Sequence, residues 1–156
     1  MLMTILLIGA SSPAHSAVKN LPEEVWASLK DASGFQIRAS VSAIPGSVRM
    51  SFAKARGEEL FAMAEPGAEW QSTDVVRKPG LPRRRLETVA LSPSLCILFY
   101  ELGGRGHSHH VVVFRFSMDD AKLVWRAVRD RAITDPAALL MGIERGTVND
   151  DPKYGF

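Results

Sequence analysis

Cysteine is nearly absent from this chain, which contains Cys96 and no other. One thiol cannot form an intramolecular disulfide, and it cannot supply the several thiolates of a structural zinc site. An excess of one charge is also lacking, since 19 Lys and Arg residues are balanced by 17 Asp and Glu residues. Nucleic-acid-binding domains are normally far more basic. We therefore expect a fold that is stabilised by packing alone, and no nucleic-acid partner.

The N-terminal apolar run, residues 1–10, is too short to cross a bilayer, which takes about 20 apolar residues. It has the length of the hydrophobic part of a secretory signal. Ala14 and Ser16 provide small side chains at the third and first positions before a cut. The pattern predicts a cleaved signal peptide at residues 1–16, an exported bacterial-type protein, and a periplasmic or secreted location. Since no cysteine lies near the cut, we expect no stable membrane anchor after cleavage.

The same N-terminal segment lacks one signal-peptide feature, because no Lys or Arg precedes the apolar run. Two other interpretations stay open. The true translation start lies upstream, or the segment is a buried strand of a cytosolic protein.

Three stretches carry helix patterns. In residues 20–34, Asn20 and Glu23 have the spacing of a capping box, and Gly34 ends the apolar stripe. In residues 135–146, Asp135 is a typical N-cap and Pro136 suits the first helical position. Residues 47–56 suit a short helix, although their alternating apolar side chains would also fit a strand.

Alternation of apolar and polar residues predicts strands through most of the remaining chain. The predicted strands are 35–41, 60–64, 70–76, 86–91, 95–101, 107–116 and 123–128. The later connections are too short for parallel crossovers, so these strands should form antiparallel hairpins. With no repeat and no long linker, residues 17–156 read as a single α+β domain. We expect an antiparallel β-meander of about five to seven strands packed by N-terminal and C-terminal helices, with residues 147–156 as a surface tail in which Asp150 and Asp151 are solvated.

Three of the four histidines lie close together in one predicted hairpin, at His107, His109 and His110. A turn at residues 102–106 would place Glu101 opposite His107. Alternation along the strand puts His107 and His109 on one face and His110 on the other. In this register Cys96 is a diagonal neighbour of His110, at roughly 7–8 Å.

This hairpin supports three readings. Two imidazoles and a carboxylate are a ligand set for a divalent metal, so Glu101, His107 and His109 are candidate metal ligands. Glu101 and His107 are also candidate catalytic residues, because a carboxylate raises the basicity of an imidazole that it holds. The third reading is an ordinary solvated hairpin end. The glycine-rich turn 103–106 leads into a strand, so its glycines fit a tight turn better than a phosphate loop.

Basic residues surround the predicted loop at residues 79–82. Arg83, Arg84 and Arg85, preceded by Arg77 and Lys78, are candidates for binding an anionic partner. The alternative is a solvated loop with charges that protect a strand end from association.

Taken together, these features favour a non-enzymatic binding or interaction module. We expect it to bind a small ligand or a protein through the concave face or the open edge of its sheet. The alternative is a metal-dependent or Glu/His acid–base enzyme centred on the 101–110 hairpin. A divalent metal at that hairpin is the one cofactor that the sequence leaves open.

Overall fold

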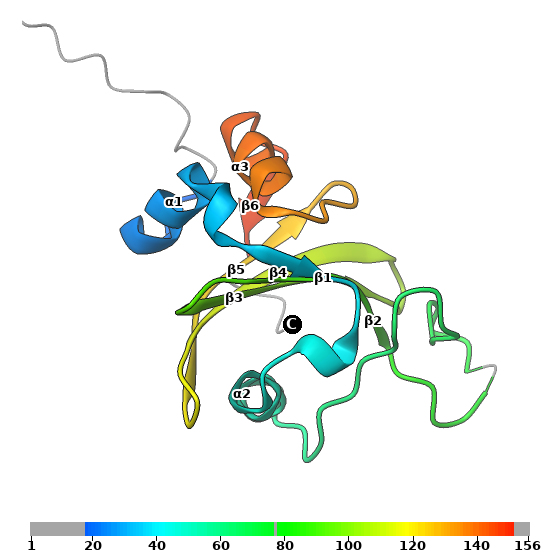
Figure 1. Ribbon diagram of the computed structural model, residues 1–156. Coiled ribbons are helices and arrows are strands. Elements are labelled where there is room, and N and C mark those ends of the chain that lie inside the picture. Colours follow the sequence, from blue (N-terminus) through cyan, green and yellow to red (C-terminus); the bar gives the residue numbers. More distant parts are fainter. Residues whose placement is uncertain (1–17, 77, 152–156) are drawn as a thin grey trace, which may run out of the picture.

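A computed structural model describes residues 18–76 and 78–151, so the predicted signal peptide, residues 1–16, lies outside the described part. A six-stranded antiparallel meander forms the centre of the fold, with the strands side by side in chain order (Figure 1). The sheet and its helices confirm the predicted α+β class. The strands are β1 (Gln36–Arg38), β2 (Arg84–Leu91), β3 (Leu95–Leu102), β4 (Ser108–Phe116), β5 (Ala121–Arg129) and β6 (Val148–Asp150).

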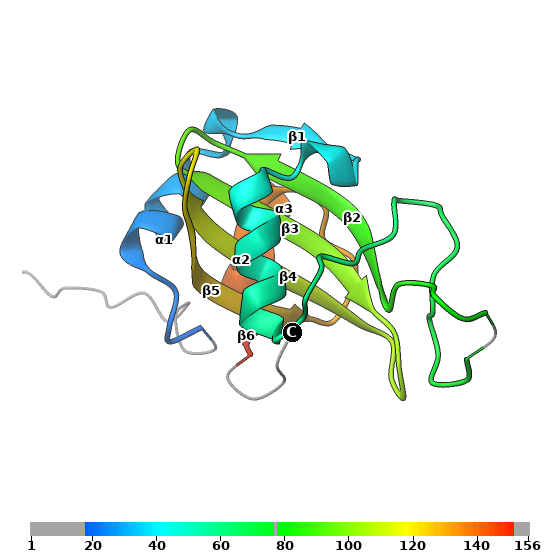
Figure 2. The same ribbon diagram turned by 90° about the horizontal axis from the view of Figure 1, so that it is seen from below.

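Helices pack on both faces of this sheet. On one face lie α1 (Glu23–Lys30), which is followed by a 3-10 turn at Ala32–Gly34, and α3 (Pro136–Glu144). On the other face, α2 (Gly46–Arg56) follows a 3-10 turn at Val41–Ala43 and lies across the strands, which curve around it (Figures 1 and 2). The helix predicted at residues 47–56 is therefore confirmed.

The two central strands carry apolar side chains on both faces. Ile97 and Phe99 of β3 join the core under α1 and α3, whereas Leu98 and Tyr100 join the core under α2. All four side chains are fully buried. Burial on both faces explains why residues 95–101 are apolar almost throughout.

The strands predicted at residues 60–64 and 70–76 are wrong. This part of the chain forms a long loop with one isolated bridge in each stretch, between Ala64 and Arg85 and between Thr73 and Gly104. β1 pairs only with the second half of β2, from Val89 to Leu91. Along the first half of β2, the loop makes only the bridge between Ala64 and Arg85.

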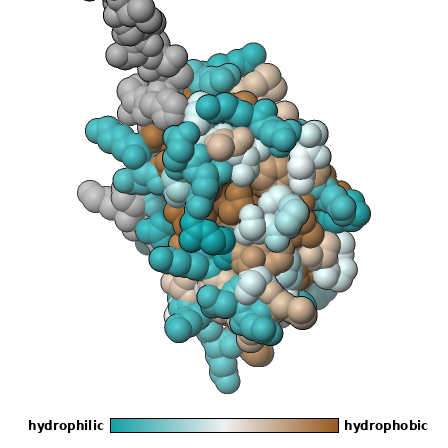
Figure 3. Space-filling model, turned by 60° about the vertical axis from the view of Figure 1, so that its left-hand side comes forward, coloured by the Kyte–Doolittle hydropathy of each residue, from teal (hydrophilic) through white to brown (hydrophobic). Residues whose placement is uncertain are grey.

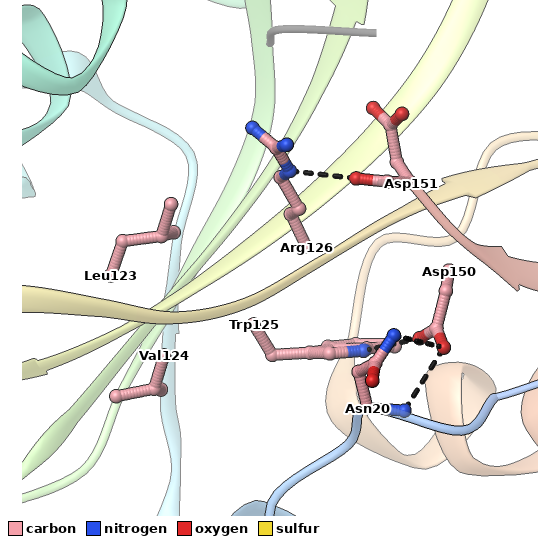
Figure 4. Close-up of a pocket in the computed structure, with 7 residues that line it drawn as sticks. All are labelled: Asn20, Leu123, Val124, Trp125, Arg126, Asp150 and Asp151. Carbon is pink, nitrogen blue, oxygen red and sulfur yellow. Dashed lines mark hydrogen bonds between the residues drawn. The ribbon is translucent and has the colours of Figure 1, made fainter. Parts of the chain in front are cut away.

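The surface tail was also a wrong prediction, since its first residues form β6 and Asp151 is 4% exposed. Asp150 accepts hydrogen bonds from the backbone N–H of Asn20 and from Trp125 Nε1 at 2.8 Å (Figure 4). It also accepts one from the backbone N–H of Lys19. Asn20 therefore joins the N-terminal segment to β6 and does not cap α1, which begins after Pro22 without a side-chain cap. The hydrogen bonds to Asp150, which is far from Asn20 in the sequence, therefore replace the capping box that the local pattern predicted.

Candidate metal site at the hairpin end of the sheet

Six charged or imidazole side chains meet where β3 and β4 join, on the face of the sheet that carries Phe99. We call them the hairpin cluster. Its members come from β2, β3, β4, β5 and the turn before β4, and they are Arg85, Glu87, Glu101, His107, His109 and Arg129.

The strand register differs from the predicted one by two residues. Glu101 pairs with His109, and Leu102 pairs with Ser108, so the turn runs from residue 103 to 107. Gly103 explains this position: a Cβ there would lie 2.1 Å from the carbonyl oxygen of Gln71. Contact with the long loop thus selects where the turn begins. Because a shift of two residues keeps every side chain on its face, the predicted grouping of Glu101, His107 and His109 survives.

Glu101 stands at the centre of the cluster. Its Oε1 accepts a hydrogen bond from His107 Nε2 at 2.8 Å, and its Oε2 accepts one from Arg85 Nε at 2.6 Å. Burial raises the pKa of Glu101, but the hydrogen bond and charge of Arg85, together with His107, outweigh burial and hold this pKa below its usual range. Glu101 is therefore ionised at neutral pH. Metal-ligating atoms of Glu101, His107 and His109 all lie within 4.8 Å of one another.

A second carboxylate orients His109. Glu87 Oε1 lies 2.7 Å from His109 Nδ1, and Glu87 Oε2 accepts a hydrogen bond from Arg129 at 2.5 Å. The Arg129 side chain is fully buried. With Nδ1 held by Glu87, His109 keeps Nε2 for another partner.

Sequence reasoning missed Glu87 and Arg129. A shift in the pairing of β2 with β3 between Leu86 and Thr88 marks a bulge there, and Glu87 sits at that irregularity. One signal was present in the sequence: Glu87 is an acidic residue inside an otherwise mostly apolar predicted strand.

The long loop supplies one aromatic wall of the cluster. The Arg85 guanidinium lies 5.1 Å from the centre of the Trp70 ring, and the Trp70 and His107 rings meet edge to face with their centres 5.5 Å apart. Beside this wall is a cavity of about 540 Å³, lined by Trp70, Arg85, Lys78 and their neighbours. The cluster therefore has a pocket next to it.

The three arginines that were predicted to bind an anionic partner lie in different parts of the molecule. Arg83 is exposed, whereas Arg84 is 5% exposed and pairs with Glu58 at 2.5 Å on the α2 side of the sheet. Arg85 belongs to the hairpin cluster. The structure therefore does not bring the three guanidinium groups onto one surface.

The other face of the hairpin carries His110, which stacks on Tyr100. Cys96 pairs with Phe114, four positions along β4 from His110, so the predicted diagonal contact between Cys96 and His110 is wrong. Burial raises the pKa of the Cys96 thiol, and at neutral pH it behaves as a core side chain.

His110 should make the protein less stable in mild acid. Burial lowers the pKa of His110 from 6.5 to about 4, although Asp151 partly opposes the shift. Between these values the unfolded chain takes up a proton that the folded protein does not, so stability falls as the pH drops from about 6.5 to about 4. The shift corresponds to about 3 kcal/mol. Urea unfolding at several pH values measures it. In His110→Gln the slope over this window should flatten, and an unchanged slope would contradict the assignment.

The surface shows how the remaining apolar side chains are distributed. The face seen in Figure 3 is covered mainly by hydrophilic residues, with hydrophobic ones gathered towards its middle. Large exposed hydrophobic side chains come from separate elements, among them Met50, Leu60 and Met118. A smaller cavity of about 230 Å³ lies at β5. In it, Asn20 and Trp125 both donate hydrogen bonds to the Asp150 carboxylate (Figure 4). Its polar groups are already engaged in joining the N-terminal segment to β6.

No protein-family model matches this chain, and searches of curated proteins and of solved structures found no significant match. Among the described residues, no helix has the length and apolar character needed to cross a membrane.

Proposed function

We propose that this protein is an exported binding module whose ligand is a divalent transition-metal ion of the zinc class. Glu101, His107 and His109 are the ligands. The observation that carries this proposal is the convergence of their donor atoms within 4.8 Å at one end of the sheet. The signal-like residues 1–16 support the exported location.

Supporting side chains around the three ligands strengthen the proposal. Histidines that bind metals almost always hold a carboxylate or carbonyl with the second ring nitrogen, and such partners raise metal affinity. Glu87 has this relation to His109, and Arg129 in turn holds Glu87. Arg85 fixes the far oxygen of Glu101, which leaves Oε1 as the donor.

Metal binding requires only a small movement of the three ligand side chains, whose donor atoms lie within 4.8 Å of one another. Zinc–nitrogen bonds of about 2.0–2.1 Å place tetrahedral ligand atoms about 3.3 Å apart. His107 is the most exposed of the three, at 46% of its side chain, and it lies in the turn, so it is the ligand whose movement towards the other two disturbs the sheet least. The negative charges of Glu87 and Glu101 balance the positive charges of Arg85 and Arg129. The site therefore has no net positive charge that would repel the ion.

The second candidate is a metal-dependent enzyme at the same place. Three protein ligands leave a fourth position for water or substrate, as in catalytic zinc sites. The cavity beside Trp70 and Arg85 is the observation that favours this candidate. Glu101 and His107, the predicted acid–base pair, are hydrogen-bonded but would serve as ligands in the metal-bound form.

Zinc titration of the tag-free protein tests the proposal. We expect one ion per chain by calorimetry, and a stabilisation of about 2.7 kcal/mol when free zinc is 100 times the dissociation constant. The double variant His107→Ala/His109→Ala should lose both signals, whereas Glu144→Gln, on an exposed helix end, should keep them. Glu87→Gln should weaken binding about 10- to 100-fold. Zinc binding by the double variant with unchanged affinity would overturn the proposal, as would absence of binding by the wild type.

A further inference from the structure

A second polar group lies on the opposite face of the β3–β4 hairpin, away from the hairpin cluster. Ser108 and His110 are two residues apart on β4 and therefore point to the same side. They line a cavity of about 670 Å³ together with Asp151 and the turn Gly103–Gly104–Arg105–Gly106. The proposed metal site does not use any of these side chains.

The His110 ring lies between the Ser108 hydroxyl and the Asp151 carboxylate. Ser108 Oγ lies 2.8 Å from His110 Nε2, within hydrogen-bonding distance. On the far side of the ring, His110 Nδ1 faces Asp151 Oδ2 at 3.9 Å. This second distance is longer than a hydrogen bond, as is common for catalytic contacts before substrate binds.

Packing fixes the imidazole ring. His110 is 3% exposed and stacks on Tyr100, with ring centres 5.3 Å apart and planes at 18°. Asp151 is held at the end of β6, where its N–H donates to the Arg126 carbonyl at 3.3 Å and its carbonyl accepts from Arg126 Nε at 2.7 Å. With the proton on Nδ1, facing Asp151, His110 Nε2 accepts from the serine hydroxyl.

We propose that Ser108 is a nucleophile for acyl transfer from a small carboxylic ester, with His110 as its general base. A hydroxyl within reach of an imidazole that is itself oriented by a third group is the diagnostic geometry of this chemistry. Leu102 and Val128 give the cavity apolar walls, which suit a short aliphatic acyl chain. The adjoining glycine-rich turn lines the same cavity.

The steps balance with water as the second reactant. Ser108 Oγ bonds to the acyl carbon while its proton passes to His110 Nε2, and the ester C–O bond breaks as that proton moves to the departing alcohol. Water then attacks the acyl-serine, its proton passes to His110 Nε2, and the carboxylic acid leaves as Ser108 regains the proton.

The test uses 4-nitrophenyl butyrate hydrolysis and a fluorophosphonate probe on the full chain, with excess EDTA to remove any metal contribution. We expect the probe to label Ser108, located by peptide mass mapping. Ser108→Ala and His110→Gln should lower hydrolysis above the buffer rate at least about 100-fold, and Ser42→Ala, at an exposed serine, should leave it unchanged. Thermal unfolding checks that each variant is folded.

Two results would overturn the proposal. One is a wild-type protein in which the probe leaves Ser108 unmodified, and this outcome does not depend on whether any variant folds. The other is a folded Ser108→Ala variant that hydrolyses the ester at the wild-type rate.

Discussion

Arg129→Leu is expected to lower the free energy of unfolding by about 3–5 kcal/mol, because removing one partner of a buried ion pair leaves the other charge uncompensated. The Arg129 side chain is fully buried, and its guanidinium donates to Glu87 and to the Ile133 carbonyl. Glu87, whose side chain is 9% exposed, would lose the cation with which it pairs. Urea denaturation measures the change from the midpoint at constant slope.

The double variant Glu87→Gln/Arg129→Leu separates the ion pair from simple loss of packing. Because the second substitution removes the stranded carboxylate charge, we expect the double variant to be more stable than Arg129→Leu alone. Arg131→Leu, at an exposed position two residues away, should change stability by less than about 0.5 kcal/mol. The assignment fails if Arg129→Leu is no less stable than this exposed control.

Loss of Arg129 should also affect metal binding. Glu87 would no longer be held by Arg129, so it would orient the His109 ring less firmly. We therefore expect zinc affinity to fall in the Arg129 variant, even though Arg129 is not a ligand.

Phe52→Ala is expected to cost about 3–5 kcal/mol, the usual range for truncating a buried phenylalanine. Phe52 is fully buried and carries the contact between α2 and the sheet. Its ring meets those of Phe61 and Tyr100 edge to face, with centres 5.4 and 5.8 Å away, and the Arg84 guanidinium lies 5.4 Å from its centre. Alanine would leave a cavity between these groups that a rigid sheet cannot close.

Urea denaturation of three α2 variants tests this expectation. Met50→Ala serves as the matched control, because Met50 belongs to the same helix but is 67% exposed and should change stability by less than about 0.5 kcal/mol. Phe52→Leu should cost less than Phe52→Ala, since it leaves a smaller cavity. Equal stability of Phe52→Ala and Met50→Ala would show that α2 does not anchor the core in this way.

Much of the fold was predictable because it depends on local patterns. The apolar stretch 95–101, the alternation in 107–116 and the short connections between strands indicated an antiparallel meander, and the structure has one. The helix patterns at residues 47–56 and 135–146 correspond to α2 and α3. The predictions that failed, the strands at 60–64 and 70–76 and the surface tail, concerned segments whose state depends on distant partners.

The candidate site was predictable in part. Alternation along residues 107–110 assigns His107 and His109 to one face and His110 to the other. Since a register shift of two residues keeps Glu101 on the face of His109, their grouping with Glu101 survived. Glu87 could not be placed in the same way, because the bulge at Leu86–Thr88 interrupts the alternation of β2. The pairing of Ser108 with His110 followed the same alternation, but their cavity depends on Asp151, more than forty residues later in the chain.

The antiparallel meander and the face that each hairpin histidine occupies follow from local sequence patterns, since both depend on the spacing between near neighbours. Tertiary structure alone decided the register, where Gly103 packs against the backbone of Gln71 and Ser72. It also decided that Glu87 and Arg129 support His109, and that Asp151 reaches His110. These contacts join residues far apart in the chain, and their formation depends on how the bulge, the long loop and β6 pack together, which no local pattern encodes.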